Sequence, residues 1–166
     1  MSKSANPDVR KRNVAEWSTP PELFQALDDE FHFTLDACAQ PWNAKCKKFF
    51  TPQDDGLAES WAGETVFCCP PSGVTEYREW TQKALEESRH KGTTVVMLLP
   101  VSTDTQWFHK SILGQKGVTI RFLSERVRFV NSVLPSWRQP ATKYGGPRST
   151  MVVVMTGKRT KFKVEI

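Results

Sequence analysis

Apolar and polar positions form blocks along the chain that predict strands and helices in turn. Two continuous apolar runs, at residues 65–69 and 93–100, predict strands that are buried on both faces of a sheet. Between them, apolar residues recur with helical spacing over residues 74–90 and predict a helix. A strand, a helix and a strand in this order favour a parallel sheet, because a helical crossover joins parallel strands.

Weaker patterns extend this outline to both sides. Thr19-Pro20-Pro21-Glu22 predicts a helix start, with Thr19 as the N-cap and Glu22 completing a capping box. The remaining predicted elements are a short strand at 33–39, a short helix within 40–61, a helix at 103–113, strands at 118–123 and 127–130, and a last strand at 150–156. The predicted fold class is therefore α/β, a mainly parallel sheet with helices on both faces and an antiparallel edge.

Two features follow predicted strands, where open parallel sheets bind their ligands. Asp36 ends the strand at 33–39, and alone it fits a contact to a nucleoside-bearing cofactor or a helix N-cap equally well. Cys69-Pro70-Pro71-Ser72 follows the strand at 65–69. Its two prolines remove two backbone donors and leave carbonyl oxygens that can accept from an exocyclic amine of a base. The same proline pair can also do no more than end a strand.

Several classes of site are excluded or disfavoured. The chain has no GxGxxG and no GxxxxGK[ST] motif, so kinases and nicotinamide-dependent dehydrogenases are excluded. The four cysteines form no CxxC pair and the three histidines lack metal-ligand spacing, so we expect reduced thiols and no metal. Cys38, Cys46 and Cys68 are expected to be packing residues, as are Trp42, Trp61 and Trp107.

The 166 residues fit one domain with a sizeable core. The pattern places this domain at residues 15–157, between a flexible basic arm at 1–14 and a basic C-terminal tail at 158–166. No run approaches the roughly 18 apolar residues of a membrane span. The polar start also lacks the apolar core of a signal peptide. We therefore expect no membrane contact and a cytoplasmic location.

Charge divides the chain into two unequal parts. Residues 1–113 hold 12 Lys and Arg against 16 Asp and Glu, a net charge of −4, whereas residues 114–166 hold 11 against 2, a net charge of +9. Clustered cations favour a polyanion such as nucleic acid, although a solvated basic face is the alternative. The residues expected to contact DNA are Arg126, Arg128, Arg138, Lys143 and Arg148, with Trp137 and Tyr144 among them.

A series of short segments carries a resemblance over nearly the whole chain, from about Trp17 to Thr156. The segments are Trp17-Ser-Thr-Pro20, Phe33-Thr-Leu-Asp36-Ala-Cys38-Ala39, Asn43-Ala-Lys-Cys46, Phe49-Phe50-Thr51-Pro52, Asp55-Gly56-Leu57, Trp61, Pro70-Pro71, Leu98-Leu99-Pro100, Thr103-Asp104-Thr105 and Arg126-Val127-Arg128-Phe129. In order and spacing they resemble the phage-encoded DNA N6-adenine methyltransferases, the phage Dam-like family.

The resemblance implies a Rossmann-like fold that uses S-adenosylmethionine (AdoMet) and acts on double-stranded DNA, in the host cytoplasm if the chain is phage-encoded. It also implies the cofactor-binding residues, which are Trp17, Thr19, Pro20, Asp36, Ala37, Cys38, Ala39 and Asp55. Asp55 would accept from the adenine amine of the cofactor. Cys69, Pro70, Pro71 and Ser72 fall on the catalytic tetrapeptide, which is usually Asp/Asn-Pro-Pro-Tyr/Phe.

The chain departs from that tetrapeptide at its first and fourth positions. Cys69 is a weak acceptor for an amine proton, and Ser72 cannot stack on a flipped base. Phe67, Tyr77 or Trp80 could supply the stack instead. Two hypotheses follow: an AdoMet-dependent DNA N6-adenine methyltransferase, or a catalytically impaired relative that binds DNA, AdoMet or a protein partner. A nucleophilic Cys69, as in pyrimidine C5 methylation, is disfavoured because that cysteine follows a proline, whereas Cys69 precedes two.

Overall fold

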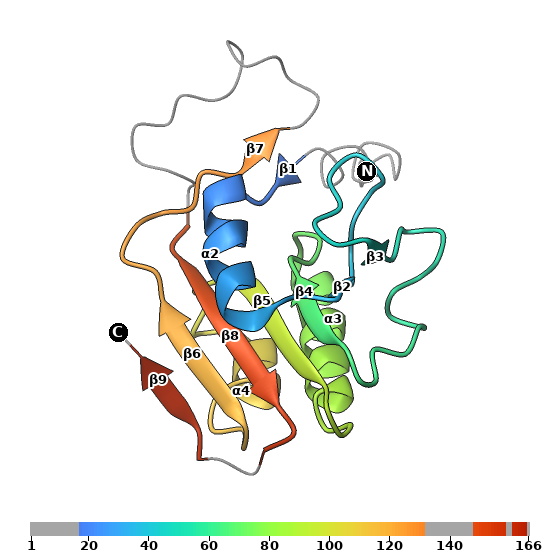
Figure 1. Cartoon of the computed structure of the whole chain (residues 1–166). Helices are drawn as coiled ribbons and strands as arrows, with labels where there is room; N and C mark the ends of the chain where they lie inside the picture. Colours follow the sequence, from blue (N-terminus) through green and yellow to red (C-terminus); the bar gives the residue numbers. More distant parts are fainter. Residues whose placement is uncertain (1–16, 132–147, 159–160, 166) are drawn as a thin grey trace, which may run out of the picture.

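The computed structural model describes residues 17–131, 148–158 and 161–165. Figure 1 shows their arrangement as a central sheet with helices on either side. The strands are β1 (Trp17–Ser18), β2 (Leu35–Asp36), β3 (Lys48–Phe49), β4 (Thr65–Cys68), β5 (Thr94–Pro100), β6 (Val118–Phe122), β7 (Val130–Asn131), β8 (Thr150–Thr156) and β9 (Lys163–Glu165). The helices are α2 (Pro21–Phe31), α3 (Val74–Glu87) and α4 (Gln106–Ser111).

The main sheet has seven strands in the order β3-β2-β4-β5-β8-β6-β9. β3, β2, β4 and β5 are mutually parallel, and β9 is parallel to β6. β8 is antiparallel to both of its neighbours and lies between β5 and β6. The predicted α/β class with a mainly parallel sheet and an antiparallel edge is confirmed, with the refinement that the antiparallel strand is inserted rather than terminal.

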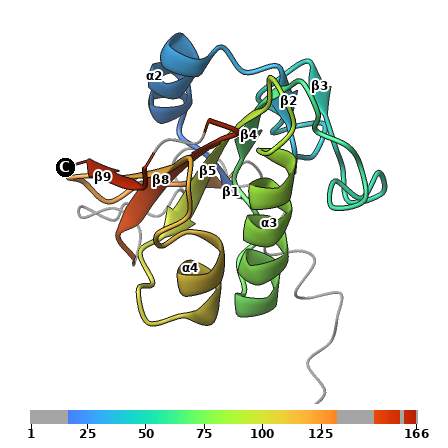
Figure 2. The same cartoon turned by 90° about the horizontal axis from the view of Figure 1, so that it is seen from below.

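Both faces of the sheet are covered by helices (Figure 2), as predicted. β5 shows why a continuous apolar run was required, because its side chains alternate between two cores. Val95, Met97 and Leu99 belong to the core on the side of α3 and α4. Val96 and Leu98 belong to the core that packs against α2. The site therefore rests on strands that are packed on both faces.

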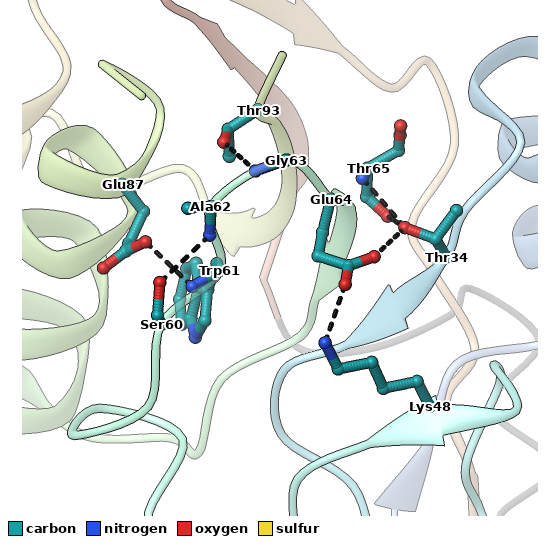
Figure 3. Close-up of polar contacts among 10 residues, drawn as sticks. All are labelled: Thr34, Lys48, Ser60, Trp61, Ala62, Gly63, Glu64, Thr65, Glu87 and Thr93. Atoms are coloured by element: carbon teal, nitrogen blue, oxygen red, sulfur yellow. Dashed lines mark hydrogen bonds and ion pairs between the residues drawn. The ribbon is translucent and has the colours of Figure 1, made fainter. Parts of the chain in front are cut away.

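Polar contacts at the amino ends of the strands fix β4 against its neighbours (Figure 3). The Glu64 carboxylate accepts from the Thr34 hydroxyl at 2.5 Å and from the Lys48 ammonium at 2.7 Å. The Trp61 N–H donates to the Glu87 carboxylate at 2.8 Å, which ties the approach to β4 to the end of α3. These contacts at the amino ends fix the register of β2 and β4, and so the relative position of their carboxyl ends, which carry the two predicted site features.

Four local predictions are wrong. α2 begins at Pro21 with Pro20 as its N-cap and no side-chain cap, so Thr19 is not the N-cap. Residues 40–61 form turns and β3 rather than a short helix. The strand expected at 127–130 is limited to β7, which pairs antiparallel with β1 in a separate two-stranded sheet. Trp42 is 61% exposed rather than buried, whereas Trp61 and Trp107 are in the core as predicted.

The ends of the chain add two observations. The proposed arm at 1–14 lies outside the described residues. Within the segment assigned to a basic tail, residues 163–165 form β9, a strand paired with β6. No helix among the described residues is long and apolar enough to cross a membrane.

Candidate active site

The sheet has a topological switch point between β2 and β4. After β2 the chain continues to β3 on one side, and after β4 it continues to β5 on the other, so it leaves these two adjacent strands in opposite directions. Asp36 ends β2 and Cys68 ends β4, which brings Asp36 and the tetrapeptide at 69–72 to one point. The Ala37 N–H donates to the carbonyl oxygen of Phe67 at 3.0 Å and joins the two strand ends. Open α/β sheets bind ligands at such a point.

The Asp36 carboxylate organises the loop that follows β2. Asp36 is 3% exposed. Its Oδ1 accepts from the Cys38 N–H at 3.4 Å, and its Oδ2 accepts from the Lys45 N–H at 3.0 Å. Burial raises the pKa of Asp36 to about 6, against the two backbone hydrogen bonds and the Lys45 ammonium, which favour the charged form. A pKa of about 6 leaves the carboxyl group mostly ionised at neutral pH, and its bonds to the Cys38 and Lys45 N–H groups hold the loop around it.

Thr19 reaches the tetrapeptide from the start of α2. Its side chain is buried and hydrogen-bonds the Cys69 thiol. Burial, and next the neighbouring Cys38, raise the pKa of Cys69 to about 12. The thiol is consequently neutral at physiological pH, and a neutral thiol is a poor nucleophile. This environment argues against a covalent role for Cys69.

Two further thiols lie behind the tetrapeptide. The Sγ atoms of Cys38 and Cys68 are 3.8 Å apart, and Cys68 is fully buried, as predicted. All four cysteines are free. Among the described residues, no group of three or more His, Cys, Asp or Glu side chains is placed to hold a metal ion.

The last residue of the tetrapeptide contacts an aromatic side chain of α3. Pro70 is buried and Ser72 is exposed. The Ser72 side chain forms a hydrogen bond with the hydroxyl of Tyr77, whose ring centroid lies 5.5 Å from that of Trp107. Burial raises the pKa of Tyr77, so its hydroxyl stays protonated at neutral pH.

The other two aromatic candidates point into the cores. Phe67 is 2% exposed and belongs to the core against α2, where its ring meets that of Phe24 at 5.1 Å. Trp80 is 8% exposed and stacks on Trp61 at 6.0 Å. Of the three candidates, Tyr77 is the one with a partly exposed side chain beside the tetrapeptide.

The turn that carries Asp55 packs against the loop after β2. Asp55 is exposed and has a left-handed backbone with a φ of 55°. A Cβ at Gly56 would clash with the carbonyl oxygen of Ala37 and lie 3.1 Å from the Trp80 ring. The buried Trp61 indole N–H donates to the Gly56 carbonyl oxygen at 2.9 Å and fixes the turn to the core. The predicted Asp55 and Ala37 are thus carried by adjoining backbones.

The remaining predicted cofactor residues differ in their surroundings. Ala39 is buried, and its N–H donates to the Phe50 carbonyl oxygen at 2.9 Å. Pro20 caps α2 and accepts from the Phe24 N–H at 3.0 Å. Trp17 is 41% exposed and lies opposite Asn131 in the small sheet, not in the main one.

Three of the predicted DNA-contacting cations are described, and all are exposed: Arg126, Arg128 and Arg148. Arg148 precedes β8, where the Val101 N–H donates to the Ser149 carbonyl oxygen at 2.9 Å. The start of antiparallel β8 therefore lies at the carboxyl end of β5, the same edge as the tetrapeptide. Arg148 is close enough to Tyr77 to lower the pKa of its hydroxyl, against the burial that raises it. Arg138 and Lys143, with Trp137 and Tyr144, lie outside the described residues.

Comparison with known proteins identifies the family. Residues 6–164 match the family described as DNA N-6-adenine-methyltransferase (Dam). The chain belongs to the Dam family. It is 31% identical over 134 residues to the DNA N-6-adenine-methyltransferase of Haemophilus phage HP1 (strain HP1c1), a match that covers 80% of this chain and 74% of the relative. It is 32% identical over 94 residues to the protein of the same description from Escherichia phage T1, which covers 55% of this chain and 38% of that relative.

The Dam match takes in every described residue of the candidate site and confirms the resemblance that the short segments indicated. The sheet order and the helices on both faces agree with the Rossmann-like methyltransferase fold that this resemblance implied.

One member of this Dam-family site is not predicted by sequence reasoning. Lys45 supplies the backbone N–H that binds Asp36, and its side chain lies within electrostatic range of Asp36, Cys69 and Glu22. Burial lowers the pKa of Lys45, against the negative charge of Asp36, which raises it. Any residue except proline offers a backbone N–H, so no side-chain pattern could have indicated this contact.

Proposed function

We propose that this chain transfers the methyl group of AdoMet to the N6 amine of adenine in double-stranded DNA. In this reaction a bond forms between the methyl carbon and N6, the methyl–sulfur bond breaks, and N6 loses one proton. The observation that carries the proposal is the meeting of the Pro70-Pro71 pair with buried Asp36 at the switch point of a Dam-family chain.

The residues around Asp36 fit AdoMet in their chemistry. AdoMet, when bound, supplies an electrophilic methyl group on a sulfonium. The loop after β2 has small buried residues, Ala37 and Ala39, which add little side-chain bulk at the end of the strand. Asp36 is an acceptor for the amino group of the methionine end, and Asp55 is an acceptor for the cofactor's adenine amine.

The tetrapeptide would orient the amine of the target base. The N6 lone pair is delocalised into the adenine ring, so acceptors for its two protons assist attack on the methyl group. The Pro70 carbonyl oxygen serves as one acceptor. The second position is Cys69, whose sulfur is a weak acceptor and whose neutral thiol adds no charge. We therefore expect transfer to be slow relative to a chain with an amide at residue 69.

Tyr77 is the residue that we assign to stacking on the flipped base. Base-flipping enzymes hold the extruded base between aromatic or apolar side chains. The Phe67 and Trp80 rings are committed to the two cores, whereas Tyr77 hydrogen-bonds Ser72, which occupies the fourth position of the tetrapeptide. An aromatic ring one turn into α3 would then replace the one missing at residue 72. Arg126, Arg128 and Arg148 would hold the DNA backbone at this edge.

A second function is favoured by a specific observation, the pair of substitutions at Cys69 and Ser72. With both the strong acceptor and the aromatic of the tetrapeptide replaced, the chain could bind DNA, AdoMet or a protein partner without turnover. A calorimetric measurement of AdoMet binding does not separate the two functions, because an intact cofactor site serves both. Only transfer of the methyl group does.

The deciding experiment is methyl transfer from methyl-labelled AdoMet by the full chain. DNA from a strain without adenine methylation is the acceptor, and digestion to nucleosides identifies the labelled base. Label in N6-methyladenine, suppressed by S-adenosylhomocysteine, supports the proposal. Label in a methylated cytosine would refute adenine as the target base. Binding of DNA and AdoMet without any transfer of label would favour the second function, that of a catalytically impaired relative.

A further inference from the structure

A groove lined by cations runs between α3 and α4 and leads away from the candidate active site. α3 and α4 lie side by side on the face of the sheet opposite α2 (Figure 2). The hollow between them has a volume of about 350 Å³, and its polar lining includes Arg78, Arg89 and Lys110. Trp107 and Leu85 supply apolar lining.

A second hollow of about 600 Å³ extends this groove past the end of α3, where Lys116 and Lys158 line it. Leu85 and Arg89 line both hollows, so the two are contiguous. The cations of the whole groove, which we call the α3 groove, are Arg78, Arg89, Lys110, Lys116 and Lys158.

The α3 groove carries an excess of positive charge. Among its lining residues in the described part of the chain, Glu86 is the one acid, and its carboxylate accepts from Gln82 at 3.0 Å. Arg78 also pairs with Glu79 at 3.8 Å, but both side chains are at least half exposed, and such pairs contribute little. Three of the five cations come from residues 1–113, which are acidic overall. The fold therefore brings these three cations together, although residues 1–113 carry a net negative charge.

The spacing of these cations fits a polymer of negative charges better than a single anion. Arg78 and Arg89 are eleven residues apart on and just beyond α3, which corresponds to roughly 16 Å at the rise of an α-helix. One strand of duplex DNA presents a charge about every 3.4 Å along its axis, so this length faces about five phosphates. The amide of Gln106 adds a donor of a kind that binds phosphate oxygens, whereas the amides of Gln82 and Gln115 donate to Glu86 and to the Lys110 carbonyl oxygen.

The groove also begins close to the tetrapeptide. α3 starts at Val74, directly after Ser72 and Gly73, and Arg78 lies in its second turn. We infer that the α3 groove binds the phosphate backbone of DNA outside the candidate active site, on a surface separate from the one formed by Arg126, Arg128 and Arg148. The inference needs DNA as a ligand but does not depend on methyl transfer.

The test compares two double charge reversals in the full chain. Arg89→Glu with Lys110→Glu changes the groove, and Lys91→Glu with Lys161→Glu is the matched control, because these exposed lysines do not line it. Binding of a fluorescent 30-base-pair duplex is measured by anisotropy over a range of salt concentrations, and thermal melting verifies that both variants fold. We expect the groove variant to lose about tenfold or more in affinity and its salt slope to fall by about 2, with a smaller loss and an unchanged slope in the control.

Equal losses in the two variants would overturn the inference, because they would reflect net charge alone. An unchanged affinity in the groove variant would overturn it as well. If the groove variant loses binding to poly-glutamate but not to DNA, the groove serves an acidic protein and the inference is wrong. DNA binding with the expected loss, but without methyl transfer in the labelled assay, would retain the groove and refute only the proposed activity.

Discussion

Replacing Cys69 by asparagine should accelerate methyl transfer. Cysteine and asparagine are similar in size, and the change is made at a half-buried position beside the Thr19 hydroxyl, a polar neighbour already in place for an amide. The thiol is neutral because burial raises its pKa to about 12, so Cys69→Asn removes no charge. What it adds is a strong carbonyl acceptor next to the one at Pro70.

The size of the effect follows from the value of one aligned hydrogen bond in a transition state. Such a contact contributes about 2–4 kcal/mol, by analogy with oxyanion-hole donors. At about 1.4 kcal/mol per decade, the rate constant should rise by roughly 30- to 1,000-fold. The effect should fall on kcat and leave the KM for AdoMet nearly unchanged, because the amide contacts the target base and not the cofactor.

The assay is the initial rate of label transfer to DNA at saturating AdoMet, with Cys46→Asn as the matched control. Cys46 is half-buried and lies outside the tetrapeptide, so the same chemical change there should leave kcat within a few-fold. If Cys69→Asn folds and binds DNA as the unmodified chain does yet is no faster, the role given to an acceptor at residue 69 is refuted.

Three further results are expected. Gly56→Ala should lower the free energy of unfolding by about 1–3 kcal/mol in urea titrations, because its Cβ would press on the Ala37 backbone; unchanged stability would show that the turn yields freely. Burial raises the pKa of Asp36 to about 6 in the folded chain, so the folded chain binds this proton more tightly than the unfolded chain does. The protonated group should therefore stabilise the folded chain by about 3 kcal/mol below pH 4, and this contribution should be lost as the pH rises through 6. Asp36→Asn should abolish that decline in urea titrations between pH 4 and 7, and an identical pH profile in the variant would contradict it. Tyr77→Leu should lower kcat by about 5- to 150-fold, whereas Tyr77→Phe should keep kcat within a few-fold, because only the first removes the stacking ring. Adding Ser72→Tyr to Tyr77→Leu should restore activity. Such a rescue would not occur if Tyr77→Leu acted only through lost packing on Trp107.

Sequence reasoning succeeded where one-dimensional patterns reflect burial directly. The strand predicted at 150–156 has the same bounds as β8, because a strand buried on both faces is a continuous apolar run whose two ends are visible in the sequence. The helix at 74–90 agrees with α3 to within three residues, because its apolar side faces one core. Asp36 and the tetrapeptide at 69–72 were placed together by the rule that parallel strands end at a common edge.

The failures arise where tertiary contacts decide. Thr19 was expected to cap α2, but its hydroxyl contacts Cys69, which is 50 residues away in the sequence, and Pro20 takes the cap position. Trp42 was expected in the core because of its residue type alone, with no periodic pattern around it. The choice of Tyr77 over Phe67 and Trp80 also required the structure, since all three are aromatic residues near the tetrapeptide in sequence.

The inserted position of β8 has a consequence for how the chain folds. β5 and β6 are neighbours in the sequence but not in the sheet, because β8, which begins 50 residues after the end of β5, occupies the place between them. Until residues 150–156 dock, both of these strands have an unpaired edge, and that of β5 lies along a hydrophobic run. Pairing at such long sequence separation is slow. A chain interrupted before β8 would therefore retain two open edges, each a template for aggregation, so the basic C-terminal third also serves to close the fold.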